Sequence, residues 1–328
     1  MAREAGNVLR VTSYESTGFK FRVNFRKAKE YYSLIRNSQP VPLFFVNLLK
    51  IYTVKATEFN WTTKDALNIS AKDWQPEGEV KAVIALVHGF GEHSGRYEHV
   101  AEFFGKDGYA MVAYDRRGHG KSEGKRGHTK SYEAYLEEID QLLAYTRERY
   151  AGKPVLLYGH SQGGNLVLSY MLRRRPDVKG IIVTAPWIRL AFEPPSALIA
   201  IGKFTRRLMP SFSQNNQLKE GHLSRDASVG TRYVADPLVH TKITSETGIG
   251  MLESCDWLLE NAGEVHRPLL VMHGTGDEII SIEGTRDFLK KSSGNITFKE
   301  WEGAYHEIHN ETNKEEVLQY ALDWMNRV

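Results

Sequence analysis

Short apolar runs recur along the chain from about residue 80 onward, and each ends at a turn rich in Gly or Asp. Runs of this kind, apolar on both faces and rich in β-branched residues, are typical of strands inside a parallel sheet. Between them, as in 132–143 and 317–325, apolar residues recur at helical spacing. The pattern predicts an α/β fold, doubly wound, with helices on both faces of a mostly parallel central sheet. The predicted strands are 82–87, 110–115, 154–159, 180–186, 268–274 and 296–301.

Two segments of alternating apolar and polar residues precede these runs, at 55–63 and 66–74. The turn-prone pair Lys64-Asp65 separates them. Alternation on both sides of a short polar turn predicts a hairpin that opens the sheet.

One long interval breaks the alternation of strands and helices. Roughly eighty residues separate the strand at 180–186 from the strand at 268–274, far more than an ordinary connection needs. This interval contains apolar residues at roughly helical spacing, punctuated by prolines, and predicts a helical cap over 187–260 inserted into a core of 54–186 and 261–328. A satellite that only packs on the core is the alternative. We favour a lid because insertions at this edge of an open sheet lie over the crevice where ligands bind.

Residues 1–53 form a predicted N-terminal extension. No apolar core of about 7 to 15 residues marks a secretory signal at its start, so we expect a cytoplasmic protein. The apolar run at 41–52 is interrupted by Asn47 and Lys50 and is shorter than the roughly 18 residues of a spanning helix. It is interpreted as a helix that docks on the body, with a peripheral anchor at a membrane surface as the alternative.

Composition narrows the class of protein. With 41% hydrophobic and 25% charged residues, the chain is an ordinary globular protein, and its net charge of +3 gives no reason to expect a nucleic-acid partner. Cys255 is the single cysteine, which excludes an intrachain disulfide and a zinc site built on several thiolates. The twelve histidines show no H-E-x-x-H spacing, so we expect no metal and no cofactor. The oligomeric state is left open.

The strongest local signal is the sequence GHSQGG at 159–164, between a predicted strand and a predicted helix. A serine on such a sharp turn has a strained backbone that exposes its hydroxyl, and small neighbours at Gly159 and Gly163 avoid a clash. Ser161 is therefore the candidate nucleophile. A glycine-rich turn whose serine merely caps the helix is the alternative.

A serine hydroxyl needs a base to accept its proton and a carboxylate to orient that base. Asp277 follows the strand at 268–274, and His306 lies on the loop before the last helix, so the chain order Ser161, Asp277, His306 matches the nucleophile-elbow hydrolases. Glu278 is a rival acid. His309 is a rival base, interpreted instead as an exposed histidine at a helix start.

Two backbone donors are also needed for the developing oxyanion. Gln162 follows the nucleophile, and Phe90 lies in the sequence HGFG directly after the strand at 82–87. Their amides are the predicted oxyanion hole. The nearby Glu92, His93 and Arg96 are either polar substrate contacts or a buried network that ties this loop to the body.

Six motifs follow one another along the chain: HGFGEHSGRY (88–97), YDRRGHGKSEG (114–124), GHSQGG (159–164), LSRD with DPL (223–226, 236–238), HGTGD (273–277) and EGAYHEIHNE (302–311). In this order they resemble the monoacylglycerol lipase and lysophospholipase group of the α/β-hydrolase superfamily. The resemblance extends over roughly the whole chain from Val54 and implies the α/β-hydrolase fold, with the same triad and oxyanion donors.

From the triad and the apolar cap we expect a serine hydrolase, a carboxylic ester hydrolase that cleaves a single-chain acyl lipid through an acyl-enzyme. The expected partner is an acyl ester or lipid, above all a monoacylglycerol. A separate expectation is peripheral contact with a lipid surface through 41–52 and 197–209. A lysophospholipase or general carboxylesterase is the alternative within the enzyme class, and a non-catalytic ligand-binding protein is the alternative outside it. The predicted acyl-pocket residues are Phe192, Leu198, Ile201 and Phe204.

Overall fold

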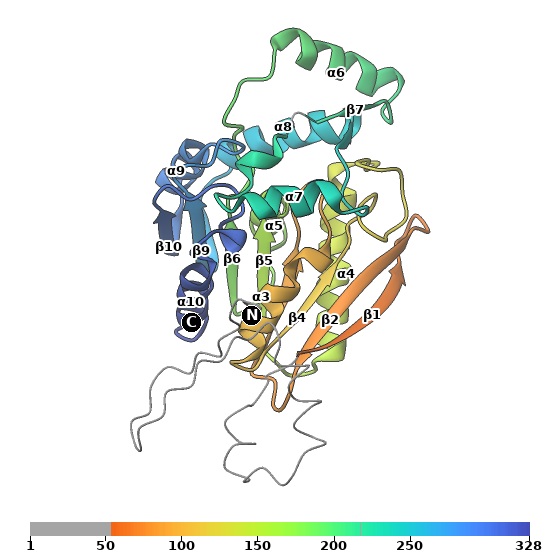
Figure 1. Ribbon diagram of the computed structural model, residues 1–328. Helices are drawn as coiled ribbons and strands as arrows, with labels where there is room; N and C mark the ends of the chain where they lie inside the picture. Colours follow the sequence, from red (N-terminus) through yellow and green to blue (C-terminus); the bar gives the residue numbers. More distant parts are fainter. Residues whose placement is uncertain (1–53, 217) are drawn as a thin grey trace, which may run out of the picture. The chain divides into compact units, whose positions relative to one another are not determined.

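The computed structural model describes residues 54–216 and 218–328 (Figure 1). The predicted N-terminal extension, with its apolar run at 41–52, lies outside these residues. Within them, eight strands form one sheet in the order β1-β2-β4-β3-β5-β6-β9-β10. The strands are β1 Val54–Thr62, β2 Asn68–Pro76, β3 Ala82–Val87, β4 Tyr109–Tyr114, β5 Val155–His160, β6 Gly180–Thr184, β9 Glu264–Gly274 and β10 Ser293–Trp301.

Strand directions follow the predicted pattern. β1 pairs with β2, and β2 with β4, in antiparallel register, whereas all pairs from β4 to β10 are parallel. Each residue of β3 is buried, because the strand lies inside the sheet and has helices on both faces. The predicted hairpin, the mostly parallel sheet and the α/β fold class are confirmed.

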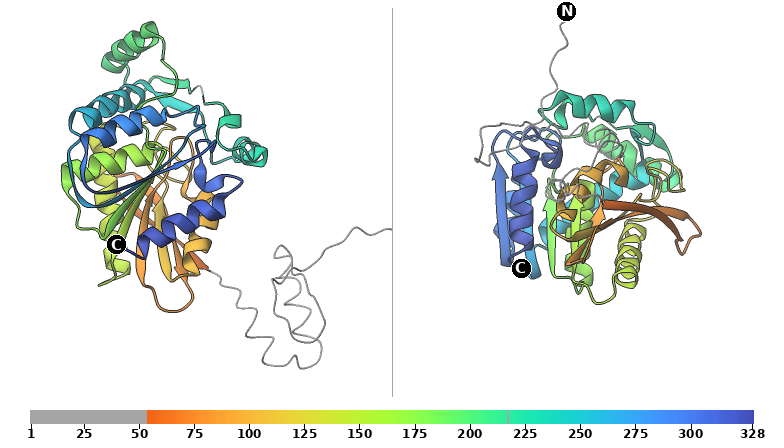
Figure 2. Two further views of the ribbon diagram at one scale, coloured as in Figure 1. Left: turned by 90° about the vertical axis from the view of Figure 1, so that its left-hand side faces the viewer. Right: turned by 60° about the horizontal axis from the view of Figure 1, so that its bottom comes forward.

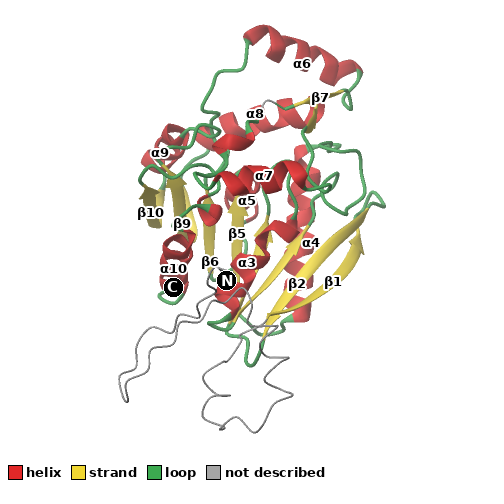
Figure 3. Ribbon diagram, in the orientation of Figure 1, coloured by secondary structure: helices red, strands yellow, loops and turns green. Residues whose placement is uncertain are grey.

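Helices cover the two faces of this sheet, as Figures 2 and 3 show from further directions and by secondary structure. On one face, apolar side chains of the sheet pack against α4 (Tyr132–Arg149), α5 (Gln162–Arg174), α8 (Ser245–Glu260) and α9 (Ile282–Lys291). On the other face they pack against α3 (Glu98–Gly105) and α10 (Lys314–Met325). The apolar stripes seen at helical spacing in 132–143 and 317–325 are the core-facing sides of α4 and α10.

The long interval between β6 and β9 contains its own small elements. After β6 come α6 (Ser196–Leu208), β7 (Ser213–Asn215), η3 (Glu220–His222), α7 (Ala227–Ala235), β8 (Lys242–Thr244) and α8. β7 and β8 pair in antiparallel register, and α6 packs on α8, which in turn packs on α4, α5 and α9. In Figure 1, α6 lies beyond α8 on the side away from the sheet. None of the helices in the described part of the chain has the length and apolar character needed to cross a membrane.

The parallel strands bring distant loops to one edge. Because β3, β5, β6, β9 and β10 run in the same direction, their carboxyl ends meet at that edge. His88 follows β3, Ser161 follows β5, and the loops after β9 and β10 contain Asp277 and His306. The fold therefore gathers the predicted site residues from four separate stretches of sequence.

Candidate active site

Ser161 lies on a tight turn between β5 and α5. Its φ of 54° and ψ of −117° are outside the regions that L residues favour. A Cβ at Gly159 would collide with the Gly163 carbonyl, and a Cβ at Gly163 would collide with the Val87 carbonyl. Glycine is therefore required on both sides of the serine, as the G-x-S-x-G pattern predicts.

The predicted triad residues lie in mutual contact. His306 Nε2 is 2.9 Å from Ser161 Oγ, and His306 Nδ1 is 2.7 Å from a carboxylate oxygen of Asp277. All three side chains are almost completely buried. Glu278, the rival acid, instead has an exposed side chain and pairs with His222 at 3.1 Å. The geometry is that of a serine, a base that can take its proton, and an acid that orients the base.

Hydrogen bonds and charge set the protonation states of this set. Burial alone would raise the pKa of Asp277, but His306 and His273 lower it well below its usual range. The amides of Ile279 and Ile280 also donate to this carboxylate, at 2.8 and 2.9 Å. Burial alone would lower the pKa of His306, but Asp277 raises it above its ordinary value. Asp277 thus stays ionised and favours a protonated His306, the form that arises when the serine loses its proton.

The loop after β3 is held by hydrogen bonds to the two peptide groups on either side of Gly89. The amide of Gly89 donates to Glu92 at 2.6 Å, while the carbonyl of Gly89 accepts from Arg116 Nη2 at 2.6 Å and lies 2.7 Å from His88 Nδ1. Phe90 follows directly. Gln162 opens α5, and the first amides of a helix have no carbonyl partner within it. The oxyanion roles of the Phe90 and Gln162 amides stay predictions.

A network of buried charges lies behind this loop. Arg96 Nη1 is 2.6 Å from carboxylate oxygens of both Glu92 and Glu307, and Arg96 Nη2 is 2.7 Å from Glu307. Tyr97 donates to Glu92 at 2.7 Å. Glu92 and Arg96 therefore form the buried network that the sequence left as one of two interpretations. The sequence did not predict a role for Glu307, because no local pattern identifies it as the partner of an arginine 211 positions away.

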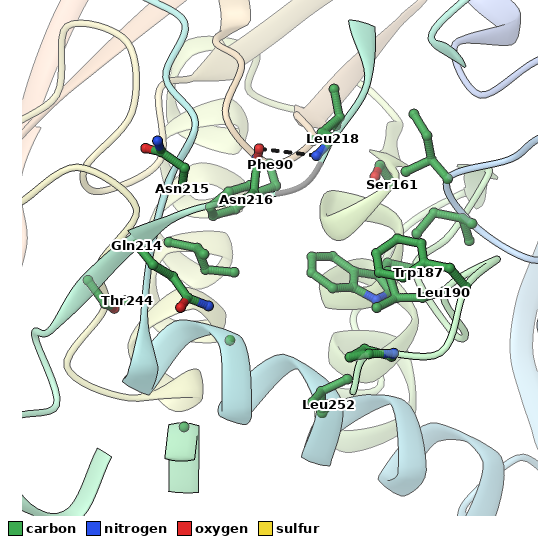
Figure 4. A pocket seen from close by; sticks show the side chains of 18 of the residues that line it. Phe90, Ser161, Trp187, Leu190, Gln214, Asn215, Asn216, Leu218, Thr244 and Leu252 are labelled. Atoms are coloured by element: carbon green, nitrogen blue, oxygen red, sulfur yellow. Dashed lines mark hydrogen bonds between the residues drawn. The ribbon is translucent and has the colours of Figure 1, made fainter. Parts of the chain in front are cut away.

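A cavity of about 310 Å³ opens onto Ser161 and His306. Its walls are mainly apolar and come from the loop after β6, from α6 and from α8. Figure 4 shows Trp187, Leu190 and Leu252 on the side of Ser161, and Gln214 and Thr244 opposite. Cavities of a few hundred cubic ångströms suit small-molecule ligands. Three of the predicted acyl-pocket residues line it: Phe192, Leu198 and Ile201.

Residues 78–313 match the model of the family described as serine aminopeptidase, S33. The chain belongs to this family of α/β-hydrolases. The monoacylglycerol lipase of Mycolicibacterium smegmatis is 32% identical over 77% of this chain and 90% of that protein.

The crystal structure of Paleococcus ferrophilus monoacylglycerol lipase is 32% identical, with a TM-score of 0.70 over 83% of this hydrolase and 98% of that chain. An uncharacterized abhydrolase domain-containing protein of Dictyostelium discoideum is 38% identical over 81% of this hydrolase, which spans only 28% of that relative's length. The predicted family and enzyme class, a carboxylic ester hydrolase, are confirmed.

Two interpretations need correction in this hydrolase. Phe204 does not line the cavity; its side chain is 66% exposed, because it lies on the face of α6 turned away from Leu198 and Gly202. His309 is not exposed but completely buried, and its ring stacks on that of Tyr97 with 4.9 Å between the ring centroids. Burial lowers the pKa of His309 well below its ordinary value, so it stays neutral.

The part of the hydrolase that the structure describes contains no candidate metal centre. His, Cys, Asp and Glu side chains there form no group of three able to hold an ion.

Proposed function

We propose that this hydrolase cleaves the ester of a single-chain acyl lipid, a monoacylglycerol, through an acyl-enzyme on Ser161. One observation carries the proposal: the Ser161 Oγ that lies 2.9 Å from His306 Nε2 is at the wall of a largely apolar cavity. An apolar cavity takes up one acyl chain, because burial of each methylene contributes about 0.8 kcal/mol. The monoacylglycerol lipases among its relatives support the same substrate.

The proposed reaction has two halves. Ser161 Oγ attacks the ester carbonyl while His306 Nε2 accepts its proton, and the amides of Phe90 and Gln162 donate to the oxyanion. The bond to the glycerol oxygen then breaks, and His306 gives its proton to that oxygen. A water molecule next attacks the acyl-Ser161 ester, with His306 again accepting a proton, and the fatty acid leaves as Ser161 regains its hydrogen.

Hydrolysis rates across three substrate series test this proposal. Rates are measured for monoacylglycerols, lysophospholipids and aryl esters of increasing chain length, with the wild type and with the Ser161→Ala variant. We expect the highest kcat/KM with a medium or long monoacylglycerol and no turnover by the variant. A preference for lysophospholipids or short esters would move the activity to one of the alternatives.

Labelling by a fluorophosphonate separates an enzyme from a binding protein of the same fold. The probe reacts with a serine whose proton is taken by a base, so it should label the wild type and not Ser161→Ala. An unlabelled Ser161 in folded protein would favour the non-catalytic interpretation.

Aminopeptidase activity, which the family's name brings to mind, has less support. An aminopeptidase binds the terminal ammonium of its substrate, and a carboxylate that is not already paired with a cation suits this contact. Among the described residues that line the cavity, the carboxylates are Glu92 and Glu307, and both bind Arg96. Aminoacyl p-nitroanilides should therefore be poor substrates; Ser161-dependent turnover at the rate of a monoacylglycerol would reverse this ranking.

We further propose that α6 contacts the lipid surface from which the substrate comes. The helix has no buried residue, and the large apolar side chains of Ile201 and Leu208 on it, and of Met209 directly after it, are more than half exposed. Lys203 and Arg207 lie on the same helix and would face anionic headgroups. The expected cytoplasmic location stays a prediction.

Co-sedimentation with vesicles of phosphatidylcholine and phosphatidylserine tests this contact. Leu208→Gln with Met209→Gln should reduce the bound fraction, while hydrolysis of a water-soluble aryl ester stays unchanged because neither residue lines the cavity. Equal binding by the double variant and the wild type would refute the role of α6.

A further inference from the structure

The charged side chains on the cavity wall all have the same sign. Among the described residues that line the cavity these are Glu92 and Glu307, with no lysine or arginine beside them. Each has an exposed fraction of 2%. Glu307 follows His306 directly in the chain, and Glu92 accepts from the amide of Gly89, so both carboxylates lie at the reacting end of the cavity.

One guanidinium serves both carboxylates. Arg96 binds Glu92 and Glu307 from behind, and its planar group also lies 4.8 Å from the ring centroid of Tyr233. Burial alone would raise the pKa of Glu307, but Arg96 lowers it to about 2, so the carboxylate is ionised at neutral pH. The cavity wall thus presents the two carboxylates, while the guanidinium that pairs with them is not among the residues that line it.

Other basic side chains nearby contact groups away from the cavity wall or are neutral. Arg116 is completely buried and donates to the carbonyl of Gly89 rather than reaching the cavity wall. His93 pairs with Asp236 at 2.9 Å. His160 has its pKa lowered to about 3 by burial and by His306, so its ring is neutral. None of these three side chains therefore places a positive charge on the cavity wall.

The rest of the cavity decides which part of an ester lies beside this charge. Leu198, Ile201 and Leu252 form apolar walls that suit an acyl chain. When the chain lies there and the carbonyl at Ser161, the alcohol portion is left at the reacting end, beside Glu92 and Glu307.

We propose that Glu92 and Glu307 make the enzyme select esters of uncharged alcohols and reject those that contain a phosphate. Resting on the proposed function, this inference names the head group that the activity accepts. A phosphate at this position would lose its hydration, find no lysine or arginine on the wall and lie beside the carboxylates of Glu92 and Glu307. A glycerol head group brings no charge and can satisfy its hydroxyls with polar neighbours or water.

Competitive inhibition by two ether lipids tests the inference without relying on turnover of any lipid. 1-O-dodecylglycerol and 1-O-dodecylglycerol 3-phosphate differ only in the phosphate, and neither has an ester to hydrolyse. Their Ki values are measured below micelle formation against hydrolysis of p-nitrophenyl butyrate. We expect the uncharged ether to bind about 30-fold or more tightly than the phosphate, a ratio that corresponds to ~2 kcal/mol.

Two matched variants identify the carboxylate responsible. Glu307→Gln keeps the size of the side chain and removes its charge, so the Ki ratio should fall about tenfold. Glu278→Gln makes the same change at an exposed carboxylate that does not line the cavity, and it should leave the ratio as in the wild type. Equal Ki values for the two ethers in the wild type, or an unchanged ratio in folded Glu307→Gln, would overturn the inference.

Hydrolysis of monolauroylglycerol is measured separately, so the two proposals fail separately. If the Ki ratio holds but monolauroylglycerol is not cleaved, the proposed function alone is wrong. If monolauroylglycerol is cleaved but the two ethers bind equally, the inference on charge alone is wrong.

Discussion

The amide of Gly89 donates a hydrogen bond of 2.6 Å to the carboxylate of Glu92. This bond holds the His88–Gly89 peptide, one residue before the amide of Phe90, which is the proposed oxyanion donor. Glu92→Leu removes the acceptor and should lower kcat about 100-fold, the scale set by loss of one oxyanion donor, with a smaller effect on KM.

Glu92→Gln is the matched control, since its carbonyl oxygen can still accept from Gly89. It should keep most of the kcat lost in the leucine variant. Measured on a short uncharged ester, equal losses of kcat in the two variants would show that the charge of Glu92, rather than its hydrogen bond to Gly89, matters to the rate.

The acid of the triad should be Asp277 and not its neighbour. Asp277→Asn places an amide against His306 Nδ1 and favours the wrong tautomer, which should lower kcat by about 10⁴. Glu278→Gln should leave kcat unchanged because Glu278 contacts His222 instead. The reverse ranking of the two variants, in steady-state kinetics at neutral pH, would move the role to Glu278.

The pH dependence of kcat/KM should report His306, which must be neutral to accept the serine proton. Asp277 outweighs burial and raises the pKa of His306 above its ordinary value, so the activity should rise with pH through a midpoint above about 6.5. Glu307 adds to this upward shift, and Glu307→Gln should therefore move the midpoint to lower pH. A midpoint that stays in place in that variant would contradict the electrostatic link.

The turn around Ser161 should tolerate no side chain at Gly163. Gly163→Ala would bring a Cβ against the carbonyls of Val87 and His88, so the free energy of unfolding in urea should fall by about 1 to 3 kcal/mol. Gly250→Ala is the control and should raise that free energy by up to about 1 kcal/mol, because on α8 the added Cβ would meet nothing within 4 Å beyond its chain neighbours and the nearby backbone of the helix. Similar stability of Gly163→Ala and the wild type would refute the close approach.

Features that depend on local pattern could be predicted from the sequence. The strands around Ile84, Met111 and Leu156 are apolar on both faces because helices cover both faces, and this leaves a continuous run in the sequence. Ser161 could be found because its turn demands glycines at fixed positions. The chain order expected for the acid and the base of the triad then pointed to Asp277 and His306.

Features that depend on distant partners could not be predicted. Glu307 looks like a surface residue until Arg96 is brought to it by the fold, and His309 is buried only because Tyr97 and His160 surround it. Phe204 shares its helix with Leu198 and Ile201, yet helical spacing alone does not say which side of an exposed helix faces a cavity. These positions needed three-dimensional packing.

The negative wall of the cavity also bears on the end of the catalytic cycle. Hydrolysis turns a neutral ester into a fatty-acid anion, and this anion is formed at Ser161, beside Glu92 and Glu307. The carboxylates that keep a charged head group out therefore also repel the newly formed product, which favours its departure. Laurate should accordingly inhibit the wild type weakly and Glu307→Gln more strongly. Glu307, which takes no part in bond breaking, would then speed release of the product and free the site for the next substrate.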